Sequence, residues 1–152
     1  MTGRPRHGVR RGSGLLLGLV LLPAVLTGCG GESDGADAAP STPEGVGTVT
    51  TGADGVQEIT LQTQDDYVFT PAEFTVGPGT VRLTLVNAAE QMTHNLRFTP
   101  DRGPAPIDAE INVLAPGQTV TIDFEVTEPG DYPFECSFHV QLGQVGTMTV
   151  RG

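Results

Sequence analysis

Residues 80–87 read Thr-Val-Arg-Leu-Thr-Leu-Val-Asn, and residues 119–126 read Thr-Val-Thr-Ile-Asp-Phe-Glu-Val. Both stretches alternate apolar and polar side chains, which is the period of a β-strand with one buried face. The side chains expected to point inward are Val81, Leu83 and Leu85 in the first stretch and Val120, Ile122, Phe124 and Val126 in the second. We therefore predict two half-buried strands that contribute to one core.

Turn-forming triplets precede strand-like stretches over residues 56–152. They are Gly77-Pro78-Gly79, Ala115-Pro116-Gly117 and Glu128-Pro129-Gly130. Their spacing suits an antiparallel sandwich, and no segment carries a convincing helical stripe of apolar residues. The pattern predicts an all-β domain, a β-sandwich of about seven or eight short strands.

Composition limits the size and the partners of the protein. The chain has 152 residues with 21 Gly, 12 Pro and no Trp, which leaves room for one small domain, expected to be a monomer. Its 18 acidic residues outnumber 8 basic ones, all Arg, for a formal charge of −10. This balance argues against nucleic acid as a partner, because a phosphate backbone repels an acidic surface.

The first 28 residues are typical of an export signal. Four Arg precede the apolar stretch from Leu15 to Leu26, which is broken by Pro23 and is shorter than a membrane-spanning helix requires. Leu26-Thr-Gly-Cys29 resembles the lipobox of bacterial lipoproteins, in which the Cys becomes the lipidated first residue. The alternatives are a transmembrane anchor, or an ordinary cleavage site followed by a chance Cys. The pair Arg10-Arg11 leaves the export route open.

Residues 29–55 are rich in Gly, Ala, Ser, Thr, Pro and acidic residues, a composition that predicts a flexible linker between the lipidated Cys29 and the domain of residues 56–152. Residues 29–152 hold all 18 acidic residues and four Arg, for a formal charge of −14. We expect the protein to be anchored by lipid to the cell membrane on its extracytoplasmic face, periplasmic or at the cell surface.

Four side chains with metal-binding atoms fall at strand ends or in one short loop. His94 shares the parity of Leu96 and Phe98, so it is expected to point inward at the start of its strand. Cys136 shares the parity of Phe134 at the end of another strand, whereas Glu135 is expected to face water.

The other two potential ligands follow Cys136 directly in the chain. Gln144 lies on the parity of Met148 at the start of the last strand, and His139 lies in the loop that joins this strand to Cys136. All four side chains should therefore meet at one end of the sandwich. A thiolate and two imidazoles with a weak fourth donor form the ligand set of a blue-copper site.

Several stretches resemble the cupredoxins, plastocyanin in particular. The segment Cys136-Ser-Phe-His-Val-Gln-Leu-Gly-Gln144 and the strand after it look like the plastocyanin ligand loop, and His94-Asn95 resembles the first His-Asn of that family. The resemblance extends over nearly all of residues 56–152. It implies a Greek-key β-sandwich, one type 1 copper held by His94, Cys136 and His139, and a one-electron carrier between extracytoplasmic redox partners rather than an enzyme.

The sequence departs from the plastocyanin pattern at the axial position, where Gln144 replaces Met. We predict that the Gln144 side-chain oxygen is the axial ligand, as in stellacyanin-type cupredoxins. Met148 is four strand residues further on, roughly 13 Å away, and is expected in the core. Met92, two residues before His94, is the other possible axial ligand.

Alternative interpretations remain for these residues. Cys136 could be a small buried hydrophobic residue or form a disulfide with Cys29, each His could be structural, and Asn95 could be a clamp between strands or a solvated surface residue. The protein could store, deliver or sense copper, or have lost the metal.

The acidic surface could serve only to maintain solubility, or it could steer the protein toward a basic redox partner. Electrons would pass through the edge of His139, which apolar Phe138, Val140 and Leu142 surround.

Overall fold

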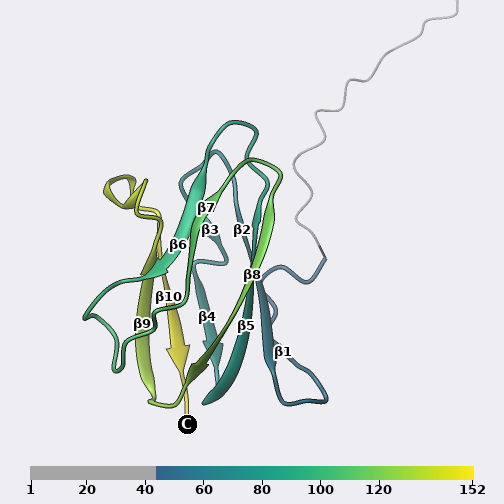
Figure 1. Ribbon diagram of the computed structural model, residues 1–152, viewed down its shortest axis with the longest axis vertical. Coiled ribbons are helices and arrows are strands. Elements are labelled where there is room, and N and C mark those ends of the chain that lie inside the picture. The colour runs from purple at the N-terminus through teal and green to yellow at the C-terminus, as the bar shows by residue number, and fades with distance from the viewer. Residues whose placement is uncertain (1–43) are drawn as a thin grey trace, which may run out of the picture. The chain divides into compact units, whose positions relative to one another are not determined.

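The computed structural model describes residues 44–152, which form two β-sheets packed against each other (Figure 1). One sheet has the order β1-β2-β5-β8, with β3 paired to β2, and the other has the order β4-β10-β9-β6-β7. The strands are β1 (Thr50–Thr51), β2 (Gln57–Thr63), β3 (Phe69–Thr70), β4 (Glu73–Val76), β5 (Gly79–Asn87), β6 (His94–Phe98), β7 (Glu110–Leu114), β8 (Thr119–Val126), β9 (Gly130–Glu135) and β10 (Val145–Val150). A 3₁₀ turn, η1 (Val140–Leu142), lies between β9 and β10.

The expected all-β sandwich is confirmed, and eight of the described strands have four or more residues. The sheets are mixed, however, and not purely antiparallel as the turn spacing indicated. β2 pairs in parallel with β5, and β4 pairs in parallel with β10. The physical reason is the path of the chain, because it leaves β2, crosses to the other sheet at β4, and returns as β5 in the original direction.

The core lies between the two sheets and is made of the inward side chains of the alternating strands. Val81, Leu83 and Leu85 of β5 are fully buried, as the alternation predicts. In β8 the prediction holds for Phe124 and Val126, whereas Ile122 is only partly buried against the core. The prediction is wrong for Val120, which is 36% exposed. β8 is an edge strand of its sheet, and its first three residues are all exposed.

Glu135 is the second departure from the alternating pattern. It was expected to face water, yet its side chain is only 11% exposed. Arg97 is its cross-strand neighbour in β6 and donates hydrogen bonds from Nε and Nη2 to Glu135 Oε1, at 3.0 and 2.6 Å. Burial of a carboxylate at this position is possible because the guanidinium neutralises it. The pair joins the strand that begins with His94 to the strand that precedes Cys136.

Gly146 allows β10 to pack tightly where it enters the core. A Cβ atom at this position would collide with the ring of Phe134 and lie 2.6 Å from the carbonyl oxygen of Ala72. Only glycine fits such a close approach of backbone and aromatic ring. Packing against Phe134 and Ala72 therefore fixes the backbone position of β10 two residues after Gln144.

Paired structure begins earlier than Val56, the expected start of the domain. Residues Thr50 and Thr51 pair with β2, and Val46 forms an isolated bridge with Thr60. The predicted signal peptide of residues 1–28, the predicted lipidation site Cys29 and the first part of the predicted linker lie outside the described residues. Within residues 44–152 there is no helix with the length and apolar character needed to cross a membrane.

Candidate metal centre

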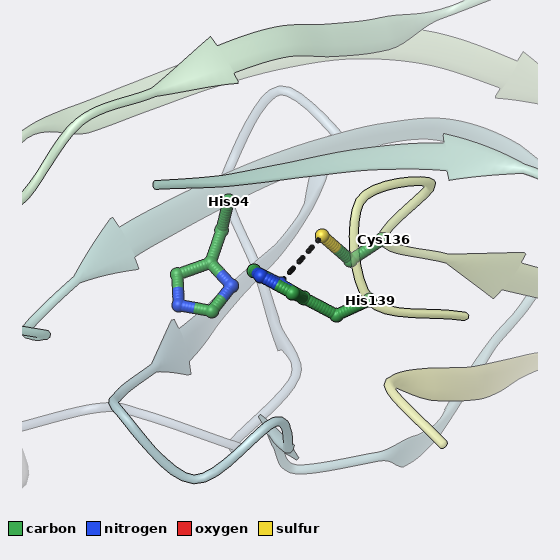
Figure 2. A group of neighbouring side chains, drawn as sticks. All are labelled: His94, Cys136 and His139. Carbon is green, nitrogen blue, oxygen red and sulfur yellow. Dashed lines mark hydrogen bonds between the residues drawn. The ribbon is translucent and has the colours of Figure 1, made fainter. Parts of the chain in front are cut away.

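The loop between β9 and β10 lies at the end of the sandwich opposite to the C-terminus (Figure 1). Cys136 directly follows β9, His139 directly precedes η1, and Gln144 directly precedes β10. His94 is the first residue of β6 and approaches them from a different part of the chain (Figure 2). The structure thus brings together the four residues that the sequence predicted to meet at one end.

Backbone hydrogen bonds close this loop on itself. Cys136 N donates to Gln144 O at 3.1 Å, and His139 N donates to Cys136 O at 3.0 Å. Gly143 adopts a left-handed φ of 90°, which turns the chain back toward the sheet after η1. Most backbone groups of the loop are therefore hydrogen-bonded, and the loop holds the side chains of Cys136, His139 and Gln144 in fixed positions.

The potential ligand atoms of His94, Cys136 and His139 all lie within 4.8 Å of one another. Cys136 Sγ lies 3.5 Å from His139 Nδ1, the contact drawn as a dashed line in Figure 2. Gln144 Oε1 lies 2.9 Å from His94 Nδ1 and 3.0 Å from His139 Nδ1. These separations are short enough for all four atoms to contact a single ion.

The hydrogen bonds of His94 define which ring nitrogen is available. Its Nε2 lies 3.0 Å from the carbonyl oxygen of Gln64, which can only accept, so Nε2 carries the proton. In the neutral ring Nδ1 is then an electron-pair donor, and it faces the oxygen of Gln144. Two electron-pair donors are stable at this distance when a cation lies beside both. This arrangement fits a metal ion, and a backbone carbonyl on the other ring nitrogen is the usual support of a metal-binding His.

Burial favours the neutral form of His94. The ring is fully buried, and loss of hydration lowers the pKa of His94 below its ordinary value, although Gln144 Oε1 opposes this effect because it accepts a hydrogen bond from Nδ1–H of the protonated ring. The neutral imidazole is the form that binds a metal. Gln144 is also fully buried, and its Nε2 has no hydrogen-bond partner within the described part of the chain. The amide is therefore oriented by its oxygen, which points into the cluster.

Asn95 connects the strand of His94 to the loop of Cys136. Its Nδ2 donates to Ser137 Oγ and its Oδ1 accepts from Ser137 N, both at 2.7 Å. Asn95 is only 7% exposed, so it is the clamp and not the solvated residue that the sequence left as an alternative.

Met148 is fully buried in the core, as expected. Cys136 has a free thiol among the described residues, and Cys29, its partner in the alternative disulfide, lies outside them.

A family profile described as copper binding proteins of the plastocyanin/azurin family matches residues 56–151. The chain belongs to this plastocyanin/azurin family. Its cofactor is copper, one ion for the single His-Cys-His cluster found among the described residues.

Relatives of this plastocyanin/azurin family member support the assignment. The chloroplastic plastocyanin minor isoform of Arabidopsis thaliana is 35% identical over 100 residues, which span 62% of this chain and 57% of the relative. Plastocyanin A/B of Petroselinum crispum is 36% identical over 99 residues, 62% of this chain and 99% of the relative. Dithionite-reduced auracyanin of Roseiflexus castenholzii has a similar structure, with a TM-score of 0.55 and 28% identity over 62% of this chain and 97% of its own.

Two contributions to the site have no counterpart in the residues predicted from sequence. The Gln64 carbonyl bonds to His94, and the ring of Tyr67 packs edge-on against His139 with 5.1 Å between ring centroids. Every residue type has a backbone carbonyl, so the sequence could not identify the contribution of Gln64. Tyr67 has a left-handed φ of 57°, which is uncommon for a residue other than Gly.

Proposed function

We propose that the chain is a type 1 copper electron carrier and not an enzyme, with His94, Cys136 and His139 as the strong copper ligands. The observation that carries this proposal is the convergence of their three donor atoms within 4.8 Å at one end of the sandwich. Copper, when bound, alternates between Cu(I) and Cu(II) and so takes up or releases one electron.

The contribution of the protein is to hold these donors in one arrangement for both oxidation states. His94 is held through its ring by Gln64 and through its strand by the Asn95–Ser137 clamp. Cys136 is held by the backbone bonds of its loop. Such restraint limits the movement that accompanies a change of charge, which is the requirement for rapid electron transfer.

Gln144 is proposed as the weak axial ligand through Oε1. Its support is the position of this oxygen, 2.9 and 3.0 Å from the two imidazole Nδ1 atoms, and the absence of a partner for Nε2 in the described residues. A carboxamide oxygen is a harder donor than the thioether of Met and favours Cu(II) over Cu(I).

Electrons are proposed to enter and leave through the edge of His139. This ring is partly exposed, and the apolar side chains beside it in the loop reach solvent, with Phe138 51% exposed and Leu142 58% exposed. Val140 is half-buried between them. An exposed apolar rim around a ligand gives a partner a surface to dock against without hydrated charges in between.

The competing function is copper storage, delivery or sensing, and kinetics distinguish it from electron transfer. A carrier should exchange electrons rapidly between oxidised and reduced copies of itself and keep its copper through repeated cycles. NMR line broadening in mixtures of the two oxidation states measures this exchange. Slow exchange combined with release of copper to a competing chelator on reduction would support the handling role instead.

The redox partner is proposed to be basic, because residues 29–152 carry a formal charge of −14. Opposite charge accelerates association and is screened by salt. The rate at which a cationic reductant reduces the oxidised protein should fall by about tenfold or more as ionic strength rises from low to high. A rate that does not respond to salt would show that the acidic surface serves solubility only.

Membrane attachment is proposed to occur through lipidated Cys29, outside the cytoplasm. Its support is the Leu26-Thr-Gly-Cys29 stretch after an apolar segment too short to span a bilayer. The mature protein should start at Cys29, carry the added mass of acyl chains, and partition with membranes, whereas Cys29→Ala should carry no acyl mass and should not be cleaved before residue 29. Mass spectrometry and fractionation measure both. An unmodified Cys29 in the mature protein would rule out the anchor.

A further inference from the structure

The loop between β2 and β3, residues 64–68, contacts both imidazoles of the cluster although none of its side chains belongs to the cluster. Gln64 O accepts the hydrogen bond from His94 Nε2 at 3.0 Å. The Tyr67 ring packs edge-on against His139. The position of this loop therefore affects the orientation of both imidazole rings, and this position depends in turn on the contacts that the loop makes with other segments.

Asp65, between these two residues, is bonded to the segment that leads into His94. Its Oδ2 accepts from Glu90 N at 2.8 Å, and its Oδ1 accepts from Met92 N at 3.0 Å and from Gln91 N at 3.3 Å. One carboxylate thus gathers three consecutive backbone N–H groups. It connects the β2–β3 loop to the β5–β6 loop two residues before His94.

The charge of Asp65 is maintained by the same contacts. The backbone N–H of Glu90 is the main reason that the pKa of Asp65 lies below its ordinary value, with further contributions from Met92 and Gln91. Asp65 therefore stays ionised at neutral pH. Because it adjoins Gln64, this fixed negative charge lies at the end of the domain that holds the cluster.

We propose that Asp65 is a positioning residue of the copper site, which holds the Gln64 carbonyl against His94 Nε2 and so keeps Nδ1 directed at the metal. The proposal rests on the proposed copper-binding function. It has two consequences. The ring of His94 stays in one tautomer before the metal arrives, and the nearby negative charge stabilises Cu(II) relative to Cu(I), which lowers the reduction potential.

The experiment compares Asp65→Ala and Asp65→Asn with Asp66→Asn as the matched control. Asp66 is the adjacent exposed acid, and its Oδ1 accepts only the Val68 N–H, at 3.1 Å, within its own loop. Asp66→Asn therefore removes the same charge from the same loop without disturbing residues 90–92. Asp65→Asn keeps one acceptor oxygen, so this variant is expected to fold even if Asp65→Ala does not.

Metal-free protein provides the first measurement. In Asp65→Ala, hydrogen exchange of the Glu90, Gln91 and Met92 amides should accelerate at least tenfold, and the ¹⁵N shifts of the His94 ring should change from a single Nε2–H tautomer to a mixture. Asp65→Asn should accelerate exchange mainly at Glu90, which loses Oδ2. Asp66→Asn should resemble the wild type in both respects.

Copper-loaded protein provides the second measurement. Both Asp65 variants should raise the reduction potential more than Asp66→Asn does, and should change the copper hyperfine splitting in the electron paramagnetic resonance spectrum. Faster exchange with an unchanged His94 tautomer and an unchanged copper signal would overturn the proposal and reduce Asp65 to a loop cap. If wild-type protein gives no copper signal at all, the copper-binding function fails instead, while the metal-free tautomer still tests Asp65.

Discussion

Replacing Cys136 by Ser should abolish the strong visible absorption that the wild-type domain develops with Cu(II). The band arises from charge transfer between a thiolate and copper, and the Cys136 thiol is the one that lies in the cluster, 3.5 Å from His139 Nδ1. Serine offers a hydroxyl, which is a poor copper ligand at neutral pH and has no comparable transition. Absorption spectra recorded during titration with Cu(II) give the result directly, and the expected loss is complete.

The serine variant should still fold. Cys136 is fully buried but small, and the exchange of thiol for hydroxyl costs about 1–3 kcal/mol, the penalty of a poorly bonded buried hydroxyl. Far-ultraviolet circular dichroism should therefore remain that of a β-sandwich. Met148→Leu is the matched control, because Met148 is a fully buried sulfur residue of the core and its replacement should leave the colour intact. Persistence of the band in Cys136→Ser would mean that another group binds the copper.

Replacing Gln144 by Met should raise the reduction potential by more than about 60 mV, which is a tenfold change in the relative affinity for Cu(I) and Cu(II) in a one-electron couple. The thioether is softer than the carboxamide oxygen that now faces both imidazoles, so it favours Cu(I). Met is similar to Gln in size and flexibility, and it removes a buried Nε2 that has no partner in the described residues. Spectroelectrochemical titration measures the shift.

Gln62→Met is the control for this experiment. Gln62 is 1% exposed, and neither of its amide atoms has a partner among the described residues, so the same substitution removes the same kind of buried amide without a bond to the cluster. Its potential should match the wild type. A potential that is unchanged or lower in Gln144→Met would rule out the axial role. A shift in Met92→Leu would then identify Met92 as the axial ligand.

Alternation of side chains was sufficient to predict much of the fold and the meeting of the four cluster residues. Parity along β6, β9 and β10 depends only on the geometry of an extended chain, so it placed His94, Cys136 and Gln144 correctly. It could not predict the parallel pairing of β2 with β5, because pairing depends on the path of the chain between the sheets. Nor could it predict that Glu135 is buried, because this requires Arg97 on a neighbouring strand.

The supporting contacts of the site were less accessible to sequence reasoning. The Gln64 carbonyl is a backbone atom, and every residue type offers the same one. Asp65 is one of two consecutive acids in a loop, and only the folded chain distinguishes the acid that binds residues 90–92 from the acid that caps its own loop. Such contacts depend on tertiary structure rather than on a local pattern.

Three of the four cluster side chains come from residues 136–144, a segment closed by its own backbone hydrogen bonds between two neighbouring strands. This arrangement concentrates most of the donor set in one short stretch of sequence. Insertions or new side chains within it would alter the chemistry of the metal while the register of β9 and β10 stays the same. Evolution could thus diversify the redox behaviour of such a domain by editing one short stretch of the gene.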